Sequence, residues 1–245
     1  MTQDAKVAIV TGGCRGIGLA ATEIFLEQGW RVAVVDRDVE ELHRTCDPME
    51  NVLAVEADIS DPQSVDGVIR SVVGQWGRVD ALVNNAGVAL FSRVGQTSFE
   101  QWREVMATNL DGVFLCTQAA VPELAKTNGA IVNIASTEAL GATGLHSPYS
   151  AAKGGVTSLT RSLAVELGRE GITVNCICPG PIRTGITDRI SEEHKTIYAK
   201  RRTALARYGD PEEVAHMTLS LCLPAASFLT GAVIPVDGGL MARNA

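Results

Sequence analysis

The residues best suited to chemistry stand in the segment SPYSAAKGG, where Tyr149 and Lys153 are four positions apart. The surrounding segment of small residues is interpreted as a helix, in which side chains four positions apart point to one face. A phenol is a poor base while its pKa is about 10. An ammonium group one helical turn away stabilises the phenolate and lowers that pKa, which suits acid–base catalysis. Such pairs also occur in ordinary amphipathic helices, so the rest of the chain has to decide between the two interpretations.

A hydroxyl group stands thirteen positions before Tyr149, because Ser136 ends the apolar run AIVNIAS. Such a hydroxyl can hydrogen-bond a substrate oxygen and hold it against Tyr149. Hydride transfer between a carbinol carbon and a nicotinamide needs a base for the hydroxyl proton, while the cofactor carries the hydride step. The three side chains of Ser136, Tyr149 and Lys153 are therefore candidates for alcohol–ketone chemistry.

A glycine-rich turn, TGGCRGIG, follows the first apolar run and opens the first predicted helix. Gly12, Gly16 and Gly18 are spaced G-x-x-x-G-x-G, which differs from the common G-x-G-x-x-G fingerprint. Both spacings allow a tight turn, close approach of the backbone to a pyrophosphate, and an anion at the helix N-terminus. A glycine turn without a ligand is the alternative, and the strand before it and helix after it favour phosphate binding.

The choice of dinucleotide depends on Asp36, which ends the second apolar run, RVAVVD. A carboxylate there can accept hydrogen bonds from both ribose hydroxyls and repels a 2′-phosphate, which selects NAD over NADP. Arg15 in the glycine loop and Arg37 directly after Asp36 point the other way, since either could pair with a 2′-phosphate. We expect NAD, with NADP as the less favoured cofactor.

Seven apolar runs that must position these residues alternate with helix-length segments along the chain. Runs this apolar indicate strands buried on both faces of a parallel sheet, and right-handed crossovers then give a doubly wound α/β fold. Helices are predicted from Gly16 to about Gln28, from Pro62 to about Trp76, and from Phe99 to about Ala125. Pro122 should kink or end the last of these. The segment 181–209 has no strand signal, and such a segment is usually functional or mobile.

The composition predicts one globular domain over residues 1–245, with 46% hydrophobic and 20% charged residues. A net charge of −7 without a Lys/Arg cluster argues against nucleic-acid and anionic membrane partners. The chain shows neither a leader pattern nor an apolar run of about 20 residues, so a cytoplasmic location is expected. Of six scattered cysteines, only Cys176 and Cys178 are close. A lone C-x-C is a poor zinc site, which predicts reduced, buried thiols and no metal.

Taken together, these motifs resemble the short-chain dehydrogenase/reductase family from about Val7 to Gly239. The resemblance implies a single Rossmann-type sheet of seven parallel strands in the order 3-2-1-4-5-6-7, with helices on both faces. It also implies a homotetramer in which the helices around 102–119 and 149–167 pack against their symmetry mates. The residues that carry it are Thr11-Gly12-x-x-x-Gly16-x-Gly18, Asp58, Asn84-Asn85-Ala86-Gly87, Asn109, Ser136, Tyr149-x-x-x-Lys153 and Pro179-Gly180.

The resemblance also assigns roles to individual residues. It implies a catalytic tetrad of Asn109, Ser136, Tyr149 and Lys153, in which Asn109 belongs to a water relay that returns the proton from Lys153 to solvent. It places Asp58 against the adenine. The cofactor-binding residues that loop and resemblance imply together are Gly12, Arg15, Gly16, Ile17, Gly18, Asp36, Arg37, Asp58, Ile59, Asn85, Ala86, Gly87, Tyr149, Lys153, Pro179, Gly180, Ile182 and Thr184.

Substrate selection is expected from the segments 89–94, 137–146 and 181–209, the last of which closes over the site as a lid. The candidate substrate contacts are Ser136, Glu138, His146, Tyr149 and Pro181. For both Glu138 and His146 the alternative is that the side chain does not contact the substrate, and for His146 this means a solvent or interface position.

The function expected from the sequence is an NAD-dependent oxidoreductase acting on a small secondary alcohol, sugar or polyol. An NADPH-dependent 3-oxoacyl thioester reductase is the first alternative. Asp36 speaks against it, as does Glu170, which stands where such reductases usually place a basic residue. A dinucleotide sensor without turnover is the second alternative, and it has no use for a phenol tuned by a lysine.

Overall fold

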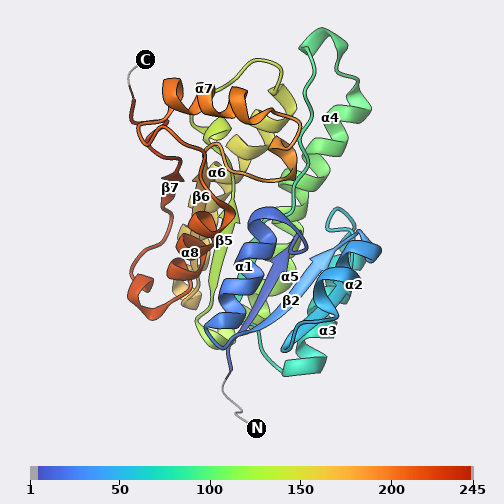
Figure 1. Ribbon diagram of the computed structural model, residues 1–245. Coiled ribbons are helices and arrows are strands. Elements are labelled where there is room, and N and C mark those ends of the chain that lie inside the picture. The colour runs from blue at the N-terminus through green and yellow to red at the C-terminus, as the bar shows by residue number, and fades with distance from the viewer. Residues whose placement is uncertain (1–4, 244–245) are drawn as a thin grey trace.

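Within residues 5–243, which this computed structural model describes, seven parallel strands lie in the order β3-β2-β1-β4-β5-β6-β7 (Figure 1). Residues 1–4 and 244–245 of the predicted domain lie outside the described residues. All seven apolar runs form strands, so the predicted fold class and strand order are confirmed. The strands are β1 (Val7–Thr11), β2 (Arg31–Asp36), β3 (Val52–Glu56), β4 (Ala81–Asn84), β5 (Ala130–Ile134), β6 (Thr173–Pro179) and β7 (Val233–Val236).

Helices cover both faces of the sheet. One core cluster packs beneath α1 (Gly16–Glu27), α2 (Val39–Cys46) and α8 (Pro211–Leu221). A second packs beneath α3 (Pro62–Trp76), α5 (Gly112–Thr127) and α6 (Ser147–Leu167). Two further helices, α4 (Phe99–Met106) and α7 (Glu192–Arg202), lie toward the top of Figure 1. Short turns complete the chain: η1 (Val94–Gln96), η3 (Thr137–Ala139), η4 (Gly168–Glu170), η5 (Gly185–Thr187) and η6 (Pro224–Ala226).

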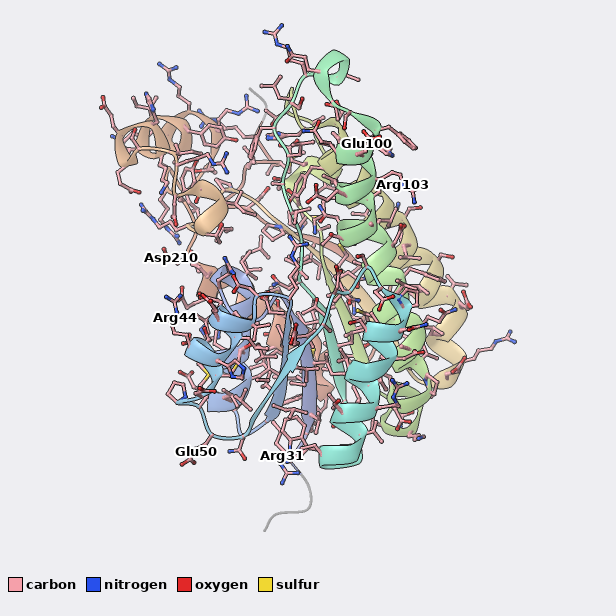
Figure 2. All side chains as sticks on the ribbon, turned by 90° about the vertical axis from the view of Figure 1, so that its right-hand side faces the viewer. Arg31, Arg44, Glu50, Glu100, Arg103 and Asp210 are labelled. Carbon is pink, nitrogen blue, oxygen red and sulfur yellow. The ribbon has the colours of Figure 1, made fainter. Side chains whose placement is uncertain are left out.

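The sheet is buried on both faces because alternate strand residues enter opposite cores. In β1, Ala8 and Val10 join the first cluster, whereas Val7 and Ile9 join the second. This double burial explains why the strands read as continuous apolar runs. Charged side chains project from the surface instead, as those labelled in Figure 2 show: Arg31, Arg44, Glu50, Glu100, Arg103 and Asp210. The six cysteines, all among the described residues, are buried and free, as predicted.

The long helix predicted from Phe99 to about Ala125 is interrupted, but not where the sequence suggested. It leaves regular α-helix at the π-helical segment η2 (Ala107–Asp111), and α5 then continues through Pro122 to Thr127. Of the two predicted effects of Pro122, a kink or an end of the helix, the end is wrong. Pro122 and Gln118 are both exposed, so the carbonyl that loses its helical donor faces water.

The segment 181–209 contains η5 and α7 and connects β6 to α8. Its two ends meet where Ile182 forms a single parallel bridge with Gly209. In the part of the chain that the structure describes, no helix has both the length and the apolar character needed to cross a membrane.

Candidate active site

The predicted catalytic residues meet at the carboxyl end of the sheet. Ser136 lies just beyond β5, and Tyr149 and Lys153 lie in the first two turns of α6. The hydroxyl groups of Ser136 and Tyr149 are neighbours, close enough for Ser136 to affect the pKa of the phenol. The Lys153 Nζ atom lies 5.9 Å from the centre of the Tyr149 ring. The strand end and the helix N-terminus thus bring the three side chains together.

Asn109 holds the turn after β4 in place from within the π-helical segment. Its side chain is fully buried, with Oδ1 accepting from Val88 N and Nδ2 donating to Val88 O, both at 2.8 Å. Gly87 fits between Asn109 and Lys153, because a Cβ on Gly87 would lie 3.3 Å from Asn109 Oδ1 and 3.5 Å from Lys153 Nζ. The structure therefore places Asn109 beside the other three candidates. A π-helical turn of this kind is common at functional sites, and the sequence pattern did not reveal it.

Burial dominates the protonation of the two ionisable candidates. Lys153 is only 3% exposed, and burial lowers the pKa of its ammonium group from 10.5 to about 8. Its Nζ donates to Ile134 O at 2.7 Å. Burial also raises the pKa of the Tyr149 phenol, and the neighbouring Ser136 hydroxyl offsets part of that rise. The spacing predicted a phenol pKa lowered by Lys153, and this prediction is wrong for the free chain, where burial raises the pKa of Tyr149.

The glycine loop is tied to the end of β4 by Thr11 and Asn85. The Asn85 side chain donates to Thr11 O and Gly12 O, both at 3.0 Å. The Thr11 hydroxyl accepts from Asn85 N at 3.0 Å and from Ala86 N at 3.1 Å. A Cβ on Gly18 would lie 2.1 Å from Gly12 O, so this close packing requires glycine. Thr11 thereby positions two loops, a role that the sequence motif alone did not assign.

The N-terminus of α1 fits a bound pyrophosphate. This helix begins at Gly16, whose φ of +54° suits glycine. Among the described residues no side chain caps its first amides, and its first turn holds no acidic residue. By contrast, Asp38 caps α2 and Asp61 caps α3. Free amides at the positive end of a helix dipole attract an anion, as a nicotinamide dinucleotide would supply.

The candidate adenosine contacts lie at the carboxyl ends of β2 and β3. Asp36 Oδ1 accepts a hydrogen bond from Asp38 N at 3.1 Å, and Arg15 forms an ion pair of 2.7 Å with Asp38. Arg15 is therefore held beside Asp36 by a second carboxylate, which sequence reasoning did not identify. Arg37 is exposed. Hydrogen bonds from Ser60 lower the pKa of Asp58, and the positive charge of Arg37 adds to that effect.

The segment after β6 reaches back to the glycine loop. Gly180 N donates to Val236 O at 3.0 Å, directly after Pro179 ends β6. Thr184 opens η5, and its Cγ2 lies 3.2 Å from where a Cβ on Gly16 would be. Three other predicted cofactor residues, Ile17, Ile59 and Ile182, pack with the hydrophobic cores.

Of the candidate substrate contacts, Glu138 is already engaged within its own loop. Its carboxylate accepts from Thr143 N at 2.8 Å, from Thr143 Oγ1 at 2.7 Å and from Ser150 Oγ at 3.2 Å. These bonds give Glu138 a structural role in shaping the loop before Tyr149. His146 lies close by, with Nδ1 at 3.7 Å from Glu138 Oε2. Pro181 O accepts from Gly209 N at 2.9 Å at the base of the segment 181–209.

The sequence profile of a family described as enoyl-(acyl carrier protein) reductase matches residues 12–241. A meso-2,3-butanediol dehydrogenase of Serratia marcescens is 38% identical over 246 residues, which cover 100% of this chain and 98% of the relative. A hydroxy(phenyl)methylsuccinyl-CoA dehydrogenase subunit of Thauera aromatica is 39% identical, with 96% of each chain covered. A 3-oxoacyl-acyl-carrier-protein reductase of Thermotoga maritima is 36% identical, with 98% and 100% covered.

These matches cover nearly the whole chain. The protein therefore belongs to the short-chain dehydrogenase/reductase family, which confirms the resemblance seen in its sequence. It is an oxidoreductase that acts on alcohol and ketone groups with a nicotinamide dinucleotide.

Proposed function

We propose that the protein is an NAD-dependent dehydrogenase that interconverts a small secondary alcohol, sugar or polyol and its ketone. The observation that carries this proposal is the grouping of the Ser136 and Tyr149 hydroxyls with the buried Lys153, whose Nζ lies 5.9 Å from the centre of the Tyr149 ring. The name of the Serratia relative, a butanediol dehydrogenase, agrees with an alcohol substrate. When bound, the nicotinamide supplies the hydride acceptor.

In this proposal Ser136 orients the alcohol and Tyr149 takes its proton. Glu138 N donates to Ser136 Oγ at 3.1 Å, so the Ser136 hydroxyl proton is free to point at an oxygen in the site. A substrate oxygen that accepts this bond lies next to the Tyr149 hydroxyl and can pass its proton to the phenolate. Lys153 stabilises that phenolate, and Asn109 keeps the turn at Gly87 and Val88 in place.

The preference for NAD rests on Asp36. Its carboxylate ends β2, where the adenosine ribose would lie, and it repels a 2′-phosphate. Arg15, which could have attracted that phosphate, is paired with Asp38 at 2.7 Å. We expect Asp36→Ala to lower kcat/KM for NAD and raise it for NADP. An unchanged ratio of the two values would contradict the role of Asp36.

The test of the proposed function is NADH formation from secondary alcohols, sugars, polyols and 3-hydroxyacyl thioesters, each with NAD and with NADP. We expect turnover of an alcohol class with NAD. Tyr149→Phe should lower kcat by about 100-fold or more while NAD binding is retained. Full activity of Tyr149→Phe would overturn the assignment of the base.

The second candidate function, an NADPH-dependent 3-oxoacyl thioester reductase, is favoured by the name of the Thermotoga relative. Turnover of the thioesters alone, and only with NADP, would establish the reductase function. It would also show that Asp36 does not select NAD.

The segment 181–209 is proposed to close over the site. Contacts at both of its sides support this: Thr184 lies against Gly16, and the Arg189 guanidinium lies 5.4 Å from the centre of the Phe91 ring. We expect amide hydrogen exchange in α7 to slow when NAD and an alcohol are both present. Exchange that does not respond to either would exclude a closing motion.

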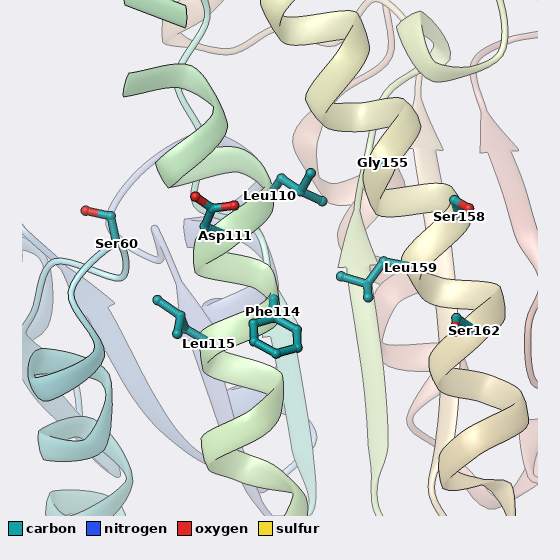
Figure 3. Close-up of a pocket in the computed structure, with 9 residues that line it drawn as sticks. All are labelled: Ser60, Leu110, Asp111, Phe114, Leu115, Gly155, Ser158, Leu159 and Ser162. Atoms are coloured by element: carbon teal, nitrogen blue, oxygen red, sulfur yellow. The ribbon is translucent and has the colours of Figure 1, made fainter. Parts of the chain in front are cut away.

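A homotetramer is proposed from the exposed faces of α5 and α6. A groove of about 560 Å³ lies between these helices (Figure 3). Phe114 is 45% exposed, and Leu110, Leu115 and Leu159 line the groove with it. Gly155, Asp111 and three serines complete the lining, and the small side chains on α6 allow a helix of a second copy to approach closely. We propose that the symmetry mate covers this groove.

A further inference from the structure

A row of stacked side chains connects the segment 181–209 to the candidate base. The Arg189 guanidinium covers Phe91, the Phe91 and His146 ring centres are 4.6 Å apart at 67°, and the His146 and Tyr149 ring centres are 6.4 Å apart. His146 stands directly before α6, one helical turn from Tyr149, so both side chains point to the same side of the helix. His146 is thereby held on two sides by rings.

The imidazole of His146 has an unusual environment. Its Nδ1 atom is buried, and among the described residues no group lies within hydrogen-bonding distance of it. The nearest charged group is Glu138 Oε2 at 3.7 Å. A lone pair on Nδ1 would face this carboxylate repulsively, whereas an N–H is attracted to it. In the neutral ring the proton therefore belongs on Nδ1, and Nε2 carries the lone pair.

The backbone beside His146 is strained. Leu145 has a φ of +75°, a left-handed conformation that is unfavourable for a leucine. A hydrogen bond of 2.9 Å from Ser92 N to Leu145 O holds it there. This bond joins the loop after β4 to the start of α6, and it fixes both Phe91 and His146 relative to Tyr149. Strain next to an unpartnered buried atom, in consecutive residues, is typical of a functional site rather than of a packing element.

We propose that His146 determines substrate specificity by accepting, at Nε2, a hydrogen bond from a second hydroxyl group of the substrate. Resting on the proposed dehydrogenase function, this assigns the substrate to the class of vicinal diols and their α-hydroxyketones. The first hydroxyl lies between Ser136 and Tyr149, and the neighbouring hydroxyl donates to His146. A 3-oxoacyl thioester presents only acceptor oxygens near its reacting ketone, so it offers the His146 lone pair no donor.

The remaining exposure of the two rings agrees with this assignment. The His146 side chain is 18% exposed, and Phe91 is 47% exposed, so this wall of the site remains accessible. Phe91 sets the orientation of the imidazole through its edge-to-face contact. Glu138, with its carboxylate anchored to Thr143 and Ser150, sets which nitrogen holds the proton. Both act as positioning residues, whereas His146 touches the substrate.

The experiment compares two substrates that differ in one hydroxyl group, butane-2,3-diol and butan-2-ol, by kcat/KM with NAD. His146→Phe keeps a ring against Phe91 but removes the acceptor. We expect it to lower kcat/KM for the diol by about 10-fold or more, mainly through KM, and to change the value for butan-2-ol by less than about 3-fold. His146→Gln, which offers an amide oxygen, should recover part of the preference for the diol.

His216→Phe is the matched control, because His216 is exposed on α8 away from the site. It should leave both values unchanged, and thermal unfolding of each variant reports whether it folds. An equal loss for both substrates in His146→Phe, or an unchanged ratio between them, would overturn the role of His146 while leaving the dehydrogenase intact. If the wild type forms NADH from neither substrate nor from any other alcohol or sugar, both proposals fall together.

Discussion

Replacing Lys153 by methionine should abolish catalysis. It should also remove the loss in the free energy of unfolding that the buried Lys153 charge causes at neutral pH. The ammonium group is 3% exposed, and its hydrogen-bond partner is the carbonyl of Ile134. Burial lowers its pKa from 10.5 to about 8, so the folded chain holds this proton less tightly than the unfolded chain does. Between these two values the unfolded state binds more protons, and the free energy of unfolding therefore rises with pH.

The size of the effect follows from the shift in pKa. Below pH 8 both states carry the proton, and the charge destabilises the folded state by about 3 kcal/mol at 1.36 kcal/mol per pKa unit. As the pH rises to about 9.5 the folded chain has lost the proton, and about 2 kcal/mol of that penalty is recovered. Lys153→Met has no such proton. The wild type should therefore gain about 2 kcal/mol relative to the variant between pH 7 and about 9.5.

Urea unfolding of both proteins at one protein concentration, at several pH values in this range, measures the difference. Groups that titrate equally in both proteins cancel in it. Lys126→Met removes an exposed lysine from α5 and should follow the wild-type curve throughout. Parallel curves for wild type and Lys153→Met would refute the reasoning, because they would mean that burial of Lys153 does not oppose its charge. The same variants should form no NADH when Lys153 is replaced and normal amounts when Lys126 is.

Three further predictions concern the elements that position the site. Gly18→Ala, whose Cβ would meet a loop carbonyl at 2.1 Å, should weaken NAD binding by about 10-fold or more in a fluorescence titration, and unchanged affinity would contradict the packing. Asn109→Ala leaves both backbone groups of Val88 without their partners, so the free energy of unfolding measured with urea should fall by about 2–4 kcal/mol. An unchanged free energy of unfolding would mean that these two hydrogen bonds do not stabilise the fold. Phe114→Glu should dissociate the proposed tetramer in light scattering, whereas Val39→Glu on α2 should not; an unchanged mass for Phe114→Glu would place the interface elsewhere.

The position of the site was predictable because a parallel sheet gathers its functional residues at one edge. The loops after β1, β4, β5 and β6 all leave from the carboxyl ends of neighbouring strands. Residues far apart in the sequence, such as Gly12, Asn85, Ser136 and Gly180, therefore had to lie near one another once the strands were identified. Continuous apolar runs identified the strands, since burial on both faces removes the alternation that a half-exposed strand shows.

Features that depend on contacts between distant segments were not predictable. The π-helical turn at Asn109 inserts a local irregularity that hardly disturbs the apolar pattern of the surrounding helix. Pro122 is tolerated because the helix face that carries it is exposed to water. The residues next to Pro122 in the sequence do not reveal that this face is exposed. Arg15 pairs with Asp38, which is more than twenty positions away in the sequence. The strained backbone of Leu145 depends on the hydrogen bond from Ser92, which is also distant in the sequence.

The free protein concentrates its unfavourable groups at the edge of the sheet where ligands are expected. Lys153 is charged in a buried position, and Leu145 is strained. The two buried side-chain atoms without partners among the described residues, Asn84 Oδ1 and His146 Nδ1, lie at the end of β4 and at the start of α6. A ligand that interacts with these groups binds the folded chain but not the unfolded chain, so it stabilises the fold by an amount that grows with the logarithm of its concentration over Kd. Lys153→Met, which removes one of these groups, is therefore expected to stabilise the free protein while it removes a side chain that the proposed reaction needs.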